Sequence, residues 1–125
     1  MILDTNAISA LADNHAGIGG VIEKLDAIAI PVIVLGEFRF GLRQSKLRLK
    51  YENWLDQLVS LCRVLIIDED TASEYALVRE ELKSKGQPIP TNDAWIAALA
   101  RQHSLGVLSR DAHFDVVARL KRLSW

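Results

Sequence analysis

Four acidic side chains stand at positions from which a folded chain could gather them at one place: Asp4, Glu37, Asp93 and Asp111. Asp4 directly follows the short apolar run 1–3, and Asp111 follows the apolar run 105–108, so each is expected near the carboxyl end of a strand. In an open α/β sheet, ligands bind in the crevice at that edge. If the two strands are neighbours, both carboxylates open into the same crevice.

The other two acids are expected to face the same crevice from helices. Asp93 lies three, four and seven residues before Ile96, Ala97 and Ala100, so it shares their inward-facing stripe. Glu37 lies in the middle of a helical pattern, at the edge of its buried face, where a solvated glutamate is unusual.

Taken singly, three of these acids have an ordinary structural explanation. Asp4, Asp93 and Asp111 are near expected helix starts, where an acid stabilises the helix dipole by about 0.3–1 kcal/mol. Together, however, four carboxylates in one crevice repel each other, raise their pKa values and destabilise the fold unless a cation neutralises them. Hard divalent ions such as Mg²⁺ prefer oxygen ligands and bridge carboxylates to phosphates. The set therefore favours metal-dependent attack of water on a phosphodiester.

Composition limits the class of protein. The chain has 125 residues, of which half are hydrophobic and a quarter charged, which predicts one folded domain spanning residues 1–125. The longest apolar run, 27–35, contains a proline and is about half of the ~20 residues a membrane helix needs. No secretory signal is visible, and the single cysteine, Cys62, fits a reducing compartment, so a cytoplasmic protein is expected. The net charge of -1 leaves only local patches for nucleic-acid binding.

Strand and helix patterns alternate along the chain. Strands are predicted at 1–3, 28–32, 63–67 and 105–108, with an edge strand at 123–125, and helices at 34–45, 47–62, 71–86, 92–103 and 111–120. This order predicts an α/β fold with a mainly parallel sheet and helices on both faces. The run 63–67 is apolar enough to be buried on both faces. Thr71 and Glu74 match a capping box, and close backbone packing is the expected reason for Gly36 and Gly41 inside a helix.

Four short blocks of the sequence resemble a known family. They are Leu3-Asp4-Thr5-Asn6, the block from Val34 to Gly41, Asn92-Asp93-Ala94-Trp95-Ile96-Ala97-Ala98, and Ser109-Arg110-Asp111-Ala112-His113-Phe114. In this order they resemble the PIN domain, in particular the VapC-type toxin ribonucleases of bacterial toxin–antitoxin pairs. Ser109 stands where many members carry threonine, which keeps a hydroxyl, and no carboxylate of the pattern is missing.

The resemblance implies a fold, an activity and partners. It implies a three-layer α/β/α sandwich and an endoribonuclease site of Asp4, Glu37, Asp93 and Asp111 that binds Mg²⁺ or Mn²⁺. It also implies that Asn6 and Ser109 support this site, that the protein forms a homodimer, and that a cognate antitoxin protein blocks the site.

Basic residues near the acids are candidates for holding the RNA backbone. Arg39 and Arg43 follow Glu37 in its expected helix, and Arg110 precedes Asp111. A solvated helix face is an equally good explanation for the basic run 39–50. The three histidines, His15, His103 and His113, are scattered through the chain and are expected to be structural or on the surface.

Three other functions use similar sequence features. A phosphotransfer protein with a phosphorylated strand-end aspartate is disfavoured, because a dehalogenase-type phosphatase wants a second Asp where Asn6 stands, and a receiver domain wants a lysine after the fourth strand. A PIN nuclease of RNA processing has the same site, although a short chain without an appended module favours the toxin. A non-catalytic module that binds RNA or protein on the same fold is disfavoured by the intact carboxylates.

Overall fold

The computed structural model describes all residues, 1–125, and is built around five short parallel strands. In chain order these are β1 (Ile2–Leu3), β2 (Ala29–Pro31), β3 (Arg63–Leu65), β4 (Val107–Leu108) and β5 (Arg122–Leu123). Their order in the sheet is β3-β2-β1-β4-β5. The predicted α/β class and the parallel sheet are confirmed.

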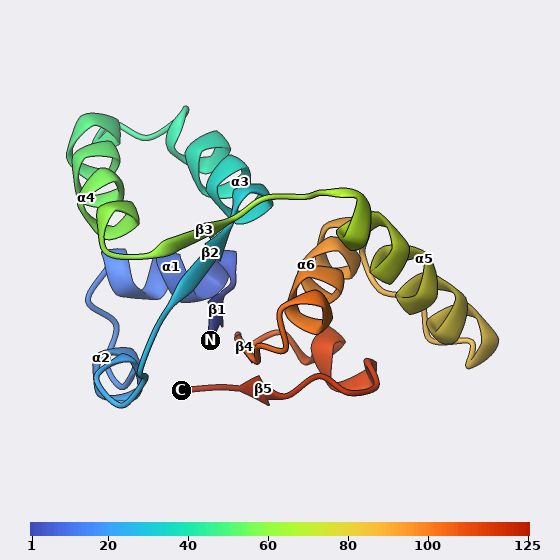
Figure 1. The fold of residues 1–125 in the computed structure, drawn as a ribbon. Coiled ribbons are helices and arrows are strands. Elements are labelled where there is room, and N and C mark those ends of the chain that lie inside the picture. Colours follow the sequence, from blue (N-terminus) through green and yellow to red (C-terminus); the bar gives the residue numbers. More distant parts are fainter.

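Six α-helices and one 3-10 helix connect the strands. They are α1 (Thr5–Ala12), α2 (Ile18–Ile22), α3 (Val32–Leu42), α4 (Arg48–Ser60), α5 (Glu69–Ser84), α6 (Thr91–Gln102) and η1 (Ala112–Val116). Helices flank the sheet on both faces, with α2 and α4 at the left of Figure 1 and α5 and α6 at its right. None of these helices is both long enough and apolar enough to cross a membrane.

The strand order places the two acid-bearing strands side by side. β1 pairs with β4 in parallel, with Ile2 opposite Val107 and Leu3 opposite Leu108. The chain leaves β1 toward β2 on one side and reaches β5 from β4 on the other, so the direction of winding changes between β1 and β4. This is the topological switch point, where open α/β sheets bind their ligands. The strands before Asp4 and Asp111 are thus neighbours, which is the condition for both carboxylates to open into one crevice.

The core is formed where α6 crosses this part of the sheet. The side chains of β1 and β4 are fully buried, and so are nearly all residues of α6 from Ala94 to Ala100. Four alanines in that stretch keep the helix thin, so that it fits between the sheet and α5, which packs against it. The first turn of α6, with Asp93, is thereby fixed against the switch point.

The third predicted strand is shorter and more exposed than expected. β3 ends at Leu65, only Leu65 is buried, and Ile66 is 64% exposed. β3 lies at the edge of the sheet and pairs only with β2. The prediction that 63–67 is buried on both faces is therefore wrong, because an apolar run does not reveal whether a strand is central or at an edge.

The helix that follows begins earlier than the sequence predicted. Asp68 is its N-cap: the Asp68 carboxylate accepts a hydrogen bond from Thr71 N at 3.0 Å, and the Thr71 hydroxyl accepts one from Asp68 N at 3.1 Å. The capping box is thus Asp68–Thr71 rather than Thr71–Glu74, and Glu74 pairs with Arg101 instead. Gly86, with φ +65°, follows the end of α5 as expected.

Three further expectations need correction. The segment 111–120 is a five-residue 3-10 helix, because the chain turns at Arg119 (φ +61°) and reaches β5 at Arg122. α3 begins at Val32, directly after β2 without a loop, rather than at residue 34. A Cβ atom on Gly36 or Gly41 would meet nothing within 4 Å, so close packing does not explain these glycines.

Candidate active site

Asp4 is the most enclosed acid of the predicted set. It caps α1 immediately after β1, and only 5% of the residue is exposed. Its carboxylate accepts hydrogen bonds from Ser109 Oγ at 2.7 Å, Thr5 N at 2.7 Å and Asn6 Nδ2 at 3.1 Å. Burial raises the pKa of Asp4, the hydrogen bonds from Ser109 and Thr5 oppose that rise, and the negative charges of Asp93 and Glu37 add to it.

Asn6 and Ser109 connect the Asp4 carboxylate to the loop after β4. Asn6 Nδ2 also donates to Ser109 Oγ at 3.0 Å, and Asn6 Oδ1 accepts the backbone N–H of Arg110 at 3.2 Å. The fully buried Ser109 hydroxyl accepts the backbone N–H of Asp111 at 2.9 Å. These contacts hold the ends of β1 and β4 together beside Asp4 and Asp111, the acids that the resemblance implies Asn6 and Ser109 to support.

Glu37 reaches the same edge from α3 and is held by two side chains. The Thr5 hydroxyl donates to Glu37 Oε2, and Asn92 Nδ2 donates to Glu37 Oε1 at 2.6 Å. Thr5 and Asn92 stand beside Asp4 and Asp93 in the sequence, but their contact with Glu37 was not predicted from it. Their only signal was that they are hydrogen-bonding residues inside two of the four blocks.

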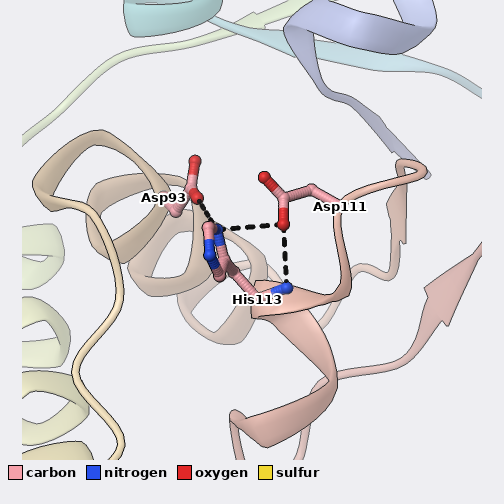
Figure 2. Close-up of side chains that lie close together, drawn as sticks. All are labelled: Asp93, Asp111 and His113. Atoms are coloured by element: carbon pink, nitrogen blue, oxygen red, sulfur yellow. Dashed lines mark hydrogen bonds and ion pairs between the residues drawn. The ribbon is translucent and has the colours of Figure 1, made fainter.

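Asp93 and Asp111 face each other across the imidazole ring of His113 (Figure 2). His113 Nδ1 lies 3.0 Å from Asp93 Oδ2 and 2.9 Å from Asp111 Oδ1. Asp111 caps η1, and its Oδ1 also accepts the backbone N–H of His113 at 2.9 Å. About half of the His113 side chain is exposed, which agrees with the expected surface position, but no role beside the acids was expected for it.

The contact between Asp93 and His113 shifts the pKa values of both groups. Burial raises the pKa of Asp93, the hydrogen bond to His113 opposes that rise, and the negative charges of Asp111 and Glu37 increase it. The hydrogen bond with Asp93 in turn raises the pKa of His113, although partial burial opposes it. Protonation of this ring is therefore favoured by the two carboxylates that it contacts.

The set of side chains fits a divalent cation. The carboxylates come from four separate segments. The negative charges of Asp93 and Glu37 raise the pKa of Asp4, and those of Asp111 and Glu37 raise the pKa of Asp93. None of the four forms an ion pair with a lysine or an arginine. Asp93, Asp111 and His113 offer ligand atoms that all lie within 4.8 Å of one another. Oxygen-rich, negatively charged sites of this kind suit Mg²⁺ and Mn²⁺.

A groove extends from the acids along α1, α3 and α4. It has a volume of about 330 Å³ and begins at Thr5 and Glu37. At its other end the Tyr51 hydroxyl donates to Asp13 at 2.9 Å. Of the four acids, Glu37 lines this groove, so an extended ligand lying in it would reach the Glu37 side of the site.

The three arginines predicted near substrate differ in what they contact. Arg39 pairs with Glu52 at 2.7 Å and with Asp56 at 3.2 Å. Arg43 is exposed at the end of α3 and forms no ion pair. The Arg110 guanidinium lies 4.6 Å from the centre of the Trp125 ring, beside the loop that carries Asp111. Of the three, Arg39 has its charge most fully neutralised by the protein.

Comparison with known proteins agrees with this architecture. The chain is 33% identical to Toxin FitB of Neisseria gonorrhoeae over 122 residues, covering 89% of the chain and 87% of that protein. It is 31% identical to Ribonuclease VapC4 of Mycobacterium tuberculosis, covering 85% of the chain and 88% of that protein. Among solved structures, the crystal structure of VapBC2 from Rickettsia felis bound to a promoter DNA fragment superposes with a TM-score of 0.89. The identity there is 26%, covering 99% of this chain and 97% of the other.

A family model matches nearly the whole chain. The model, described as "PIN domain", matches residues 1–120, which include all four acids. The resemblance noted in the sequence is thus confirmed, and the chain belongs to the PIN domain family.

Proposed function

We propose that the protein is an endoribonuclease toxin of the VapC type, which hydrolyses RNA phosphodiester bonds with the help of a divalent cation. The observation that carries the proposal is the meeting of Asp4, Glu37, Asp93 and Asp111 at the switch point of a PIN fold, where none of them forms an ion pair with a lysine or an arginine. Relatives that carry the names ribonuclease and toxin support the class of reaction.

Each group at the site has a proposed role. The four carboxylates hold Mg²⁺ or Mn²⁺, and such an ion, when bound, activates water and stabilises the charge that develops on the phosphodiester. Asn6 and Ser109 orient Asp4, while Thr5 and Asn92 orient Glu37. Attack by water needs no covalent nucleophile from the protein, so the proposed role of these residues is to hold and align the reacting groups.

RNA and an antitoxin are the proposed partners. Arg43, Arg110 and, to a smaller extent, Arg39 lie where they can follow the phosphate backbone toward the acids. Solved relatives are described as VapBC assemblies, and one of them as a toxin–antitoxin system, which supports a cognate antitoxin as a partner. That the antitoxin covers the site is what the family resemblance implies. We extend the proposal to a homodimer in the cytoplasm, where RNA and antitoxin are both present.

The experiment is cleavage of a mixed RNA pool by purified, antitoxin-free protein in Mg²⁺ and in EDTA. Asp4→Asn and Asp93→Asn should each reduce cleavage at least about 100-fold while both variants remain folded. Asp26→Asn, which removes an exposed acid in the loop before β2, is the matched control and should cleave normally.

Two outcomes would contradict the proposal. Cleavage that survives both substitutions would mean that these acids are not the site. A folded wild type that binds RNA but leaves every RNA in the pool intact would favour a binding module on the same fold.

A further inference from the structure

His113 is the one nitrogen donor among the acids. Its Nδ1 atom is 3.0 Å from an Asp93 oxygen and 2.9 Å from an Asp111 oxygen, and Figure 2 shows the ring edge turned toward both. Neighbouring ligands around an octahedral ion at about 2.1 Å are about 3 Å apart. The distances from Nδ1 to the two carboxylate oxygens therefore match those between neighbouring ligands of one ion.

We propose that His113 is a direct nitrogen ligand of the divalent cation, and that it shifts the preference of the site from Mg²⁺ toward Mn²⁺. The inference rests on the cation site of the proposed function and specifies its ligands and its metal. It assigns His113 a role beyond the four carboxylates.

The backbone around η1 fixes the ring in this place. Asp111 is the N-cap, and its Oδ1 accepts the N–H of His113, so the carboxylate and the ring leave the same tight turn on the same side. Asp93 meets them from the first turn of α6. About half of the His113 side chain is exposed, so the far nitrogen, Nε2, can keep its hydrogen and contact water while Nδ1 offers its lone pair.

A second explanation uses the same distances. A hydrogen on Nδ1, shared between Asp93 and Asp111, would make His113 a positioning residue that only holds the two carboxylates. The two roles differ in their effect on metal choice. Mg²⁺ strongly prefers oxygen, whereas imidazole nitrogen suits first-row transition ions better. A nitrogen ligand therefore favours Mn²⁺, but a hydrogen-bond donor supports both ions equally.

The test is metal binding by the full chain, without RNA. Mn²⁺ is titrated into wild type, His113→Ala and His113→Asn while free Mn²⁺ is followed by electron paramagnetic resonance, and Mg²⁺ is measured by competition. Asn places a hydrogen-bond donor near the position of Nδ1 but offers a metal only its amide oxygen. His103→Ala, which removes a histidine at the far end of α6, is the control.

We expect His113→Ala and His113→Asn to weaken Mn²⁺ binding about tenfold and Mg²⁺ binding less than about twofold. His103→Ala should change neither. Pulsed electron paramagnetic resonance of bound Mn²⁺ should show coupling to a ¹⁴N nucleus in wild type and in His103→Ala, which disappears in His113→Ala. Because this coupling is measured in wild type, the test does not depend on how well a variant folds.

Each contrary result has a separate meaning. Equal loss of both ions in His113→Ala, with recovery in His113→Asn, would make His113 a positioning residue and overturn the inference. Mn²⁺ bound without nitrogen coupling would overturn it as well, while leaving the carboxylate site and the proposed function intact. A wild type that binds neither ion would instead contradict the proposed function itself.

Discussion

Acidic side chains at the two ends of helix α6 have opposite electrostatic surroundings. At its first turn, Asp93 is partly buried, and burial together with the charges of Asp111 and Glu37 raises its pKa. At its last turn, Arg101 is almost fully buried and pairs with Glu74 at 3.1 Å and with Glu81 at 2.6 Å. Hydrogen bonding to this guanidinium holds the pKa of Glu81 below its usual range.

The presence or absence of a paired arginine distinguishes acids that stabilise the fold from acids that are available to bind a cation. The acids beside Arg101 pair with a cation of the chain itself, and hydrogen bonding to that cation favours the charged form of Glu81 in the folded protein. The acids at the switch point form no ion pair with a lysine or an arginine, so folding brings like charges together at a cost in stability. Strain of this kind is expected at sites whose binding energy comes from outside the chain.

Asp93→Asn should separate activity from stability most clearly. RNA cleavage should fall by about 100- to 1,000-fold, because the proposed cation loses a ligand and a charge. The free energy of unfolding in EDTA should nevertheless rise by about 1 kcal/mol, because a buried charge and its repulsion are removed. Urea unfolding and cleavage are measured on the same preparations, and a variant that loses stability in EDTA would contradict the comparison.

Arg101→Ala should have the opposite effect at the other end of the helix. It removes the buried cation shared by Glu74 and Glu81, leaving only the exposed Arg119 at 3.7 Å from Glu81, and should lower the free energy of unfolding by about 2–3 kcal/mol. The lower end of that range is expected, because the two glutamates keep 28% and 35% of their side chains exposed. Arg101→Lys retains the charge but not the planar fork, and it should fall between alanine and wild type. Equal stability of all three proteins would contradict the assignment.

Acid should remove the contribution of Glu81. Since the folded state lowers the pKa of Glu81, its contribution to stability is fully present above the pKa of an unfolded glutamate, about 4.3, and disappears as the pH falls through the lower folded value. Glu81→Gln should therefore be less stable than wild type by about 1 kcal/mol at pH 7. Below the folded pKa of Glu81 the two proteins should be nearly equal in stability.

The control for this titration lies on the same helix. Glu80 is exposed and forms no ion pair, so Glu80→Gln should stay within about 0.5 kcal/mol of wild type throughout. A difference between Glu81→Gln and wild type that does not change with pH would mean that the pair with Arg101 acts through packing rather than charge.

Strand-end positions were the part of the fold that the sequence predicted well. The carboxyl ends of parallel strands share one edge, so an acid after β1 and another after β4 had to meet once these strands were neighbours. The edge position of β3 depends on which strand pairs with which, and no local pattern contains that information. Asp68 was missed as a cap because Thr71, which is part of the same box, has an equally suitable hydroxyl.

His113 shows why part of the site could not be predicted. In an α-helix beginning at Asp111, as expected from the sequence, residues two apart do not face each other. In the structure Asp111 instead lies outside the helix in an extended conformation, and its carboxylate folds back over the N–H of His113. The meeting of the ring with Asp93 therefore depends on the geometry of a short turn that the sequence pattern did not indicate.

The same contrast between paired and unpaired charges applies to the arginines of α3, where the smallest effect is expected. Arg43 has no acidic partner in the protein, so Arg43→Ala should weaken RNA binding by the loss of one phosphate contact. For each phosphate contact to single-stranded nucleic acid, the binding constant falls roughly as the 0.7 power of the salt concentration. Between 50 and 200 mM salt this is a decrease by a factor of about three. The defect of Arg43→Ala should shrink by that factor over this range.

Arg39→Ala is the matched comparison, because Glu52 and Asp56 already neutralise Arg39. Its effect on RNA binding should be smaller than that of Arg43→Ala at every salt concentration, and fluorescence anisotropy with a labelled RNA and the Asp93→Asn protein, which does not degrade it, measures both. If Arg39→Ala weakens binding more than Arg43→Ala, then RNA displaces Glu52 and Asp56 from Arg39. Partners within the protein would in that case not predict which charges remain available to a ligand.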